Sequence, residues 1–266
     1  MSERFEIAII GGTGGMGRVF AKELKALADV IIISRSLEKA TKIGKTLGVR
    51  GGILKDCNTA DITIVSVPIE NTYETCQKLF KILKKGSLLI DISAVKAFIN
   101  KLKSEIPEDI SYISMHPLFS PEGSFKDFNV ILVPVKDEKW LSIIQKLLTK
   151  LGALTTITTP EEHDQIMSKM QVAHHFIYLM LASYMSDSQI SPEFFTRSFK
   201  KTLQNFTGIE KNLDAILEIQ KLNPHAKITR KEFVSMMEKF VSLDQDAEME
   251  DLQKKIQVFK EKYLSK

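Results

Sequence analysis

The sequence predicts an α/β protein in which a doubly wound parallel sheet is followed by an all-α helical domain. Three observations support this prediction. Short apolar runs alternate with helical patterns up to about residue 158, a glycine-rich turn follows the first run, and twelve of the 13 glycines lie at or before Gly152. Strands that alternate with helices are typical of a parallel sheet, whereas a region almost without glycine favours long helices. The 266 residues are enough for two modest domains with hydrophobic cores.

The first part, residues 1–158, is expected to contain seven strands. Each is a short apolar run bounded by turn residues, and helical patterns such as 71–83 and 138–151 separate most of them. The expected strands lie near 5–10, 30–33, 62–67, 87–92, 111–115, 130–134 and 154–158.

A helix start marks the boundary with the second part, residues 159–266. Thr159 is a capping residue, Pro160 suits the first helical position, and Glu162 lies three residues after the cap. A long helix is therefore expected from this point to about residue 184. Further helices are expected near 192–205, 209–222, 229–242 and 246–264.

The turn after the first strand has the spacing G-x-G-x-x-G. Gly12 permits the tight turn, Gly14 lets the backbone approach a pyrophosphate, and Gly17 lets the next helix pack against the sheet. The N-terminus of that helix offers unpaired N–H groups and the positive end of its dipole to phosphates. This context predicts a Rossmann-type dinucleotide site formed by Gly12, Thr13, Gly14, Gly15, Met16 and Gly17. The alternative is a glycine-rich turn without a ligand.

The end of the second strand indicates which dinucleotide is bound. An acidic residue there would bind the ribose hydroxyls of NAD, but this chain has Ser34, Arg35 and Ser36. A guanidinium and two hydroxyls suit a 2′-phosphate. We therefore favour NADP as the cofactor; the alternative is an exposed loop arginine with NAD bound less selectively.

His116 is the strongest candidate for a catalytic base. It follows the apolar run 110–115, and Pro117 after it holds it extended. In an open parallel sheet, ligands lie beyond the carboxyl ends of the strands. A neutral imidazole there can take a proton from a substrate hydroxyl while hydride leaves the same carbon. The alternative is a structural histidine.

Two further segments carry polar candidates. The turn 91–96 offers Ser93 and Lys96 as donors, although an ordinary strand-to-helix turn is the alternative. On the long helix, polar side chains at steps of three or four residues share one face, beside an expected apolar core stripe. The polar residues are Asp164, Ser168, Gln171 and His175, and the apolar ones are Ile166, Met170, Ala173 and Ile177. The histidine spacing predicts no metal site.

Composition narrows the partners. A net charge of +4 without a basic run predicts no nucleic-acid binding and suits an anionic small-molecule substrate. Cys57 and Cys76 have neither disulfide nor metal spacing, so we expect reduced thiols. No run has membrane length and no signal peptide is expected, so a cytoplasmic protein without membrane contact is predicted.

An apolar seam on the last predicted helix bears on assembly. The seam either packs within the chain or forms a homodimer through the helical domain. Its members are Met249, Leu252, Ile256, Phe259 and Tyr263.

Several segments in order, from residue 6 to about residue 230, resemble the prephenate dehydrogenase family. The most specific are the His-Pro run 116–121 and the His-Asp-Gln segment that begins at His163. The others are the glycine turn 11–18, the run 65–69, the turn 91–96 and the pair His175-Phe176. The resemblance implies NAD(P)-dependent oxidative decarboxylation of prephenate to 4-hydroxyphenylpyruvate in tyrosine biosynthesis. Arogenate dehydrogenase, a different NADP-linked oxidoreductase acting with a deazaflavin, and a non-catalytic dinucleotide-binding protein are the alternatives.

The resemblance also implies roles for individual residues. His116 aligns with the family's catalytic histidine, and Val67 and Pro68 lie on the cofactor side. Arg197 aligns with an arginine that holds a substrate carboxylate, and Arg230 is the next candidate for this role. Lys96, Gln171 and His175 are expected to contact the substrate. In the family, a serine before Val-Lys assists the catalytic histidine, but this chain has Ala94 at that position. The adjacent Ser93 is the candidate for that role, although successive strand residues point to opposite faces. Ser120 also replaces the usual glycine after the His-Pro motif.

Overall fold

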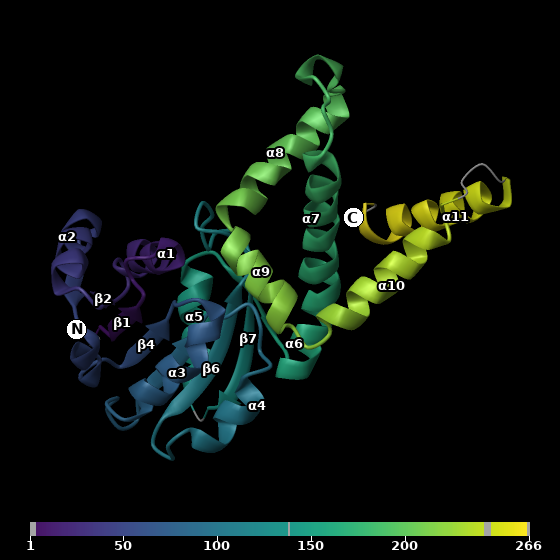
Figure 1. Cartoon of the computed structure of the whole chain (residues 1–266). Coiled ribbons are helices and arrows are strands. Elements are labelled where there is room, and N and C mark those ends of the chain that lie inside the picture. Colours follow the sequence, from purple (N-terminus) through teal and green to yellow (C-terminus); the bar gives the residue numbers. More distant parts are fainter. Residues whose placement is uncertain (1–3, 138, 242–245, 265–266) are drawn as a thin grey trace.

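The computed structural model describes residues 4–137, 139–241 and 246–264; the predicted helix ends at 138 and 242 lie outside these residues. An eight-stranded sheet forms the first part and helices alone form the second (Figure 1). The sheet order is β3-β2-β1-β4-β5-β6-β7-β8, which confirms the predicted fold class. The strands are β1 (Glu6–Ile10), β2 (Asp29–Ile33), β3 (Arg50–Gly52), β4 (Ile62–Val65), β5 (Leu88–Asp91), β6 (Ser111–Pro117), β7 (Asn129–Lys136) and β8 (Leu154–Ile157).

The sheet differs from the prediction at both edges. Strand β7 runs antiparallel to β6, and β8 pairs parallel with β7, so the sheet is mostly parallel with one antiparallel pair that was not expected. The connection at 118–128 holds no helix, and a parallel return normally needs a dozen or more residues that usually include one. Strand β3 was missed because it is only three residues long and two of them are glycine.

Two hydrophobic layers cover the sheet. Helices α1 (Gly15–Leu24), α2 (Leu37–Leu47) and α5 (Trp140–Lys150) pack on one face. Helices α3 (Ile69–Phe80) and α4 (Ile99–Leu102) pack on the other. Strands β1, β4 and β5 are buried on both faces, which explains why they are apolar without alternation.

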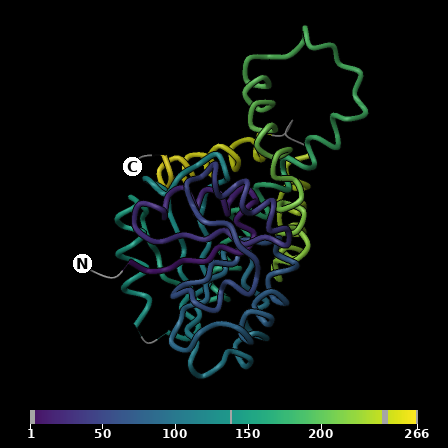
Figure 2. The backbone as a smooth tube through the Cα atoms, turned by 90° about the vertical axis from the view of Figure 1, so that its left-hand side faces the viewer, coloured from purple at the N-terminus to yellow at the C-terminus, as the bar shows by residue number. Residues whose placement is uncertain are grey.

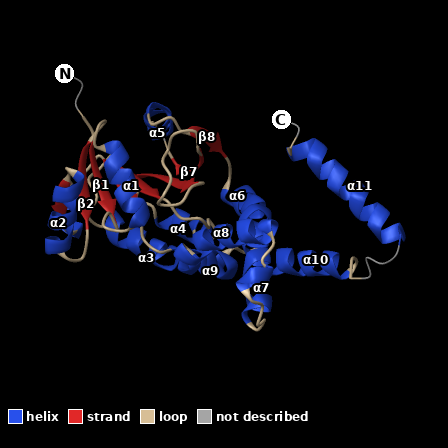
Figure 3. Cartoon of the chain, turned by 90° about the horizontal axis from the view of Figure 1, so that it is seen from above, coloured by secondary structure: helices blue, strands red, loops and turns tan. Residues whose placement is uncertain are grey.

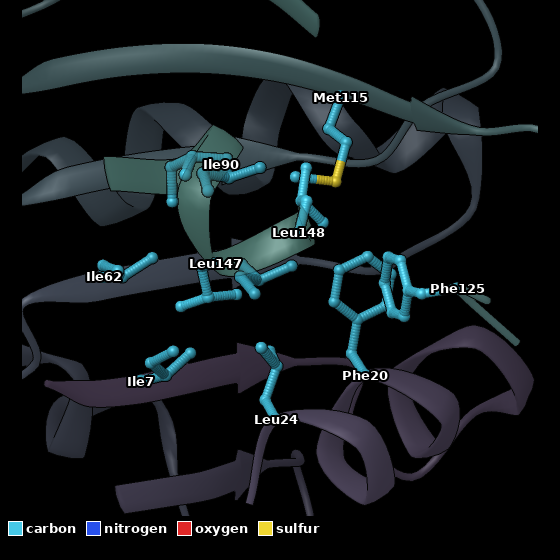
Figure 4. A pocket seen from close by; sticks show the side chains of 11 residues that line it. Ile7, Phe20, Leu24, Ile62, Ile90, Met115, Phe125, Leu147 and Leu148 are labelled. Atoms are coloured by element: carbon cyan, nitrogen blue, oxygen red, sulfur yellow. The ribbon is translucent and has the colours of Figure 1, made fainter. Parts of the chain in front are cut away.

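The layer under α1 and α5 encloses a small cavity of about 10 Å³ (Figure 4). Its lining is entirely apolar and includes Phe20, Phe125 and Leu148. An apolar cavity of this size holds no ordered water, so it belongs to the hydrophobic core and not to a ligand site.

The second part begins with the predicted long helix. Thr159 accepts a hydrogen bond from the Glu162 amide and caps α6 (Pro160–Met167). A π-helical segment (Ser168–Ala173) follows and continues into α7 (His174–Ser186). The helices α8 (Arg197–Lys211), α9 (Leu213–Leu222), α10 (Ala226–Glu238) and α11 (Asp246–Tyr263) complete the chain. Helix α8 starts later than the predicted residue 192 because Thr196 caps it by accepting from the Phe199 amide.

These helices form an open arrangement. The hairpin of α7 and α8 projects from the rest of the molecule (Figure 2). Helix α11 lies apart from the sheet and from α7 (Figure 3). Helix α9, the π-helical segment and Ala226 at the start of α10 share a small core with Val95 of the first part. Helix α6 also packs against the first part, through His163 and Asp164.

Candidate active site

The glycine turn joins β1 to α1 at the carboxyl edge of the sheet. Gly11 has a φ of +72°, and a Cβ atom there would lie 2.0 Å from the carbonyl oxygen of Ser66. A Cβ on Gly17 would lie 2.4 Å from the Gly11 oxygen, so α1 packs directly on the turn. The G-x-G-x-x-G spacing indicated Gly12, Gly14 and Gly17. It did not indicate Gly11, which is the residue of this turn with a positive φ.

The same turn fits a pyrophosphate. At Gly14 an added Cβ would meet only the Gly11 oxygen, at 3.2 Å, so the backbone faces open space. Among the described residues, no side chain caps α1 and no acidic residue lies in its first turn. The N–H groups and the dipole of α1 are therefore available to an anion. Val67 lies against Gly11, since its Cγ1 would be 3.5 Å from a Cβ there.

The candidate 2′-phosphate residues lie next to this turn. The Gly11 amide donates to the Ile33 carbonyl at the end of β2, and Ser34 to Ser36 follow directly. Arg35 is exposed. The Ser36 hydroxyl caps α2 by accepting from the Lys39 amide at 3.2 Å, so one of its lone pairs is already in use.

His116 is buried at the end of β6, parallel to β1 and β4 in the same sheet. Its Nδ1 lies 2.9 Å from Nε2 of His163, and its Nε2 lies 3.4 Å from the amide nitrogen of Gln171. Burial lowers the pKa of His116 well below its ordinary value, and the charge of Lys96 and the ring of His163 lower this pKa further. The imidazole is therefore neutral at neutral pH, as a general base requires.

The segment after His116 reaches the cofactor side. A Cβ on Gly15 would lie 2.7 Å from the side chain of Pro121, so the loop after the histidine packs on the glycine turn. The candidate base and the candidate dinucleotide site thus lie on one edge of the sheet.

The turn 91–96 differs from its predicted use. The Ser93 hydroxyl donates to the Val95 carbonyl at 2.9 Å and accepts from the Val95 amide, and no described contact joins it to His116. The Lys96 side chain is fully buried, and its Nζ donates to the carbonyls of Ser93 and Met115 at 2.6 and 2.8 Å. Both side chains bond the backbone of their own turn or of β6, and their predicted catalytic and substrate-binding roles stay predictions.

Lys96 belongs instead to a buried polar network that the sequence did not reveal. Its Nζ lies 3.6 Å from the Asp91 carboxylate, which accepts a hydrogen bond of 2.5 Å from the Tyr112 hydroxyl. Burial lowers the pKa of Lys96, while Asp91 and Asp164 raise this pKa. An aspartate directly after an apolar strand was the signal that could have indicated the network.

The polar stripe on the long helix packs inward. Asp164 and Ser168 are buried, and Gln171 reaches His116. Two of its buried atoms, Oε1 of Gln171 and Nδ1 of His175, have no hydrogen-bond partner among the described residues. Burial lowers the pKa of His175 to about 4.

The neighbouring apolar stripe on this helix is exposed, so the prediction that it forms a core face was wrong. Ile166, Met170 and Ile177 are 46, 63 and 43% exposed. The helix turns its polar side to the first part of the chain because Asp164 accepts hydrogen bonds from the Lys96 backbone there. The π-helical segment also shifts the side-chain positions after Ser168 relative to a regular helix.

Neither candidate arginine reaches His116 in the described chain. Arg197 is exposed at the start of α8, at the end of the projecting hairpin (Figure 1). Arg230 is half-buried and donates to the backbone and side-chain oxygens of Gln220 at 2.8 and 3.0 Å. It lines a groove of about 420 Å³ together with Phe176 and the basic residues Lys227 and Lys231.

The described residues hold no cluster of three or more metal-ligating side chains. Within the same residues, every helix is too short or too polar to span a membrane.

Comparison with known proteins identifies the family. A sequence model of "Prephenate dehydrogenase, nucleotide-binding domain" matches residues 20–157. A probable arogenate/prephenate dehydrogenase of Methanocaldococcus jannaschii is 31% identical over 242 residues, which are 86% of this chain and 54% of that protein. The chain belongs to the prephenate dehydrogenase family. It spans about half the length of the curated relatives that it matches.

Solved structures share the fold. A prephenate dehydrogenase from Aquifex aeolicus, in complex with hydroxyphenyl propionate and NAD+, has a TM-score of 0.78 at 20% identity. That match covers 98% of this chain and 99% of the other. An arogenate dehydrogenase from Synechocystis has a TM-score of 0.70 at 20% identity, covering 97% and 99%.

Proposed function

We propose that the protein is an NAD(P)-dependent dehydrogenase that converts prephenate to 4-hydroxyphenylpyruvate by oxidative decarboxylation in tyrosine biosynthesis. The observation that carries the proposal is the buried, neutral His116 on the same sheet edge as the glycine turn. Membership of the prephenate dehydrogenase family supports the choice of substrate.

The site supplies the base and the cofactor cradle for this reaction. The glycine turn would hold the dinucleotide, whose nicotinamide would supply the acceptor for hydride from the ring carbon that bears the hydroxyl. His116 Nε2 takes the hydroxyl proton as that hydride leaves. Loss of carbon dioxide makes the ring aromatic, and the proton returns to the phenol oxygen. Gln171 and His175 would bind the substrate, because their unpaired buried atoms need polar partners.

The test is reduction of the cofactor by purified protein, followed by absorbance. Prephenate and arogenate are each paired with NAD and with NADP. Reduction with prephenate supports the proposal, reduction with arogenate alone replaces it with arogenate dehydrogenation, and no reduction with any pair excludes a dehydrogenase of this class.

NADP is the proposed cofactor, on the evidence of Ser34 and Arg35 beside the glycine turn. A higher kcat/KM with NADP than with NAD is expected. Arg35→Ala should lose about 10-fold or more of that preference, since a charge-assisted contact with a phosphate contributes about 1.5–3 kcal/mol. Arg18→Ala is the control, because this arginine is also exposed but donates to the Thr13 carbonyl of the glycine turn and does not follow β2. A higher kcat/KM of the parent protein with NAD would overturn the preference.

A homodimer formed through the helical part, in the cytoplasm, completes the proposal. Ile256, Phe259 and Tyr263 of the predicted seam are 60, 53 and 58% exposed. The stripe of Ile166, Met170 and Ile177 on the long helix is also uncovered. Apolar surface of this extent favours association. The buried free thiols of Cys57 and Cys76 fit a reducing compartment.

A further inference from the structure

A chain of hydrogen bonds leads from His116 to a buried carboxylate. His116 Nδ1 lies 2.9 Å from His163 Nε2, and His163 Nδ1 lies 2.8 Å from Oδ1 of Asp164. The side chain of His163 has no exposed surface, so it cannot touch a bound substrate. Whatever His163 and Asp164 contribute to the reaction must therefore pass through His116.

The carboxylate fixes the direction of the first hydrogen bond. The backbone amide of Lys96 donates to both oxygens of Asp164, at 2.9 and 3.1 Å. Both oxygens therefore act as acceptors, and the bond to His163 must come from an N–H at its Nδ1. Burial lowers the pKa of His163, so its ring is neutral and its Nε2 carries a lone pair.

The second hydrogen bond then has only one possible direction. His163 Nε2 has no proton to give, so His116 must donate from Nδ1. A neutral His116 that is protonated at Nδ1 has its lone pair at Nε2. Gln171 independently indicates the same arrangement, because it approaches His116 Nε2 with its amide nitrogen, which is a donor.

We propose that His163 and Asp164 are positioning residues that hold His116 in the tautomer protonated at Nδ1, with the lone pair of Nε2 directed to the substrate. An isolated imidazole distributes its proton between both nitrogens, and only one of the two forms can act as a base at Nε2. The hydrogen bonds from Asp164 through His163 disfavour the tautomer of His116 that is protonated at Nε2, which cannot act as a base there. After proton transfer, the charge on His116 is shared through His163 with the Asp164 carboxylate. The catalytic consequence rests on the proposed function, whereas the tautomer itself does not.

The direct test is a long-range ¹H–¹⁵N correlation spectrum of the imidazoles in the full chain, with and without NADP. His116 should show a protonated Nδ1 and an unprotonated Nε2, and His163 should show the same tautomer. His116→Asn and His163→Gln assign the signals by their loss among five histidines. A proton on Nε2 of His116, or an even mixture of the two forms, would overturn the proposal. The spectrum needs no turnover, so failure of the proposed function leaves this result readable.

Two variants at residue 163 test the effect on the reaction. His163→Leu removes the acceptor, and His163→Gln can present an amide oxygen near the position of Nε2. With prephenate, His163→Leu should lower kcat by about 100-fold with little change in KM, on the scale of a lost general base. His163→Gln should keep kcat within about 10-fold of the parent, since it preserves the acceptor.

His174→Leu is the matched control, because this histidine is exposed on the same long helix. It should leave kcat and the imidazole signals of His116 unchanged. Equal loss of kcat in His163→Leu and His163→Gln with native thermal unfolding would exclude the acceptor role, and so would full activity in His163→Leu. If His163→Leu does not fold, the spectrum of the parent and the rate of His163→Gln decide the proposal.

Discussion

At the scale of the residue, burial gives ordinary side chains their special properties. The proposed role of His116 as a base depends on its burial and on the nearby Lys96 ammonium, which both lower its pKa. Lys96 is stable inside the protein because two carbonyls and Asp91 replace the water that it lost. Lys96 thus has a structural role in the turn 91–96, and the His116 imidazole is the group available for proton transfer.

Replacing His116 tests this division of roles. His116→Asn should lower kcat with prephenate by about 100-fold or more, the usual contribution of a general base. Cofactor affinity should stay nearly unchanged, because the glycine turn is intact. Steady-state kinetics and a fluorescence titration with NADP measure the two quantities. Unchanged turnover in this variant would exclude His116 as the base.

Gly11 offers a second test at this scale, with a matched control in the same chain. Gly11 and Gly86 have almost the same φ, +72° and +76°, but an added Cβ collides with Ser66 at Gly11 and meets nothing within 4 Å at Gly86. Gly86→Ala should cost only the backbone strain, about 1–2 kcal/mol. Gly11→Ala should cost at least about 2 kcal/mol more and abolish NADP binding, because the turn must move. Thermal unfolding and cofactor titration check this, and equal effects of the two variants would contradict it.

At the scale of the element, local patterns predicted the elements and long-range contacts decided their use. The apolar runs located β1, β2 and β4 within a few residues, because a strand buried on both faces must be apolar throughout. The cap at Thr159 located the start of α6, because capping depends on adjacent residues alone. The direction of β7 and the inward polar face of α6 depend on partners distant in the sequence, so periodicity could not predict them.

The candidate site follows the same division. His116 could be proposed as a site residue from the sequence, because its place at the end of a strand depends on adjacent residues alone. Its partner His163 lies 47 residues away in the sequence. The residues around Lys96 indicate only a solvated lysine in a turn. Only the folded chain shows that the Lys96 side chain is buried and that His163 contacts the ring of His116.

Helix α9 attaches the helical part to the cofactor side. Its Glu218 accepts a hydrogen bond of 2.8 Å from the Ile69 amide at the N-terminus of α3, directly after Pro68. Lys221 on the same helix pairs with Glu70. Because no described side chain of the first part caps α3, Glu218 supplies the cap from the second part.

Removing this cap should loosen the junction. Glu218→Ala should lower the free energy of unfolding by about 0.5–2 kcal/mol, the usual cost of a lost N-cap. Glu210→Ala, an exposed glutamate on α8, is the control and should stay within about 0.5 kcal/mol of the parent. Denaturant titration measures both changes. Equal stability of the two variants would show that Glu218 does not contribute a cap.

At the scale of the whole molecule, the two parts bury their surfaces to different extents. The sheet is covered on both faces, whereas α7, α10 and α11 expose many large apolar side chains. Tyr184, Met237 and Phe259, for example, are 78, 55 and 53% exposed. An open set of helices around such surface is typical of a chain that completes its core by pairing with a second copy.

A charge placed in the seam of α11 tests the proposed dimer. Ile256→Glu should shift the protein from dimer to monomer, because burying an unpaired carboxylate in an apolar interface is unfavourable by several kcal/mol. Val258→Glu adds the same charge at a residue of similar exposure, 62% against 60%, about 200° away around the helix. This control should remain dimeric. Sedimentation velocity at matched concentrations distinguishes the outcomes. A dimeric Ile256→Glu variant would place the interface away from the seam, and a monomeric parent protein would exclude the dimer altogether.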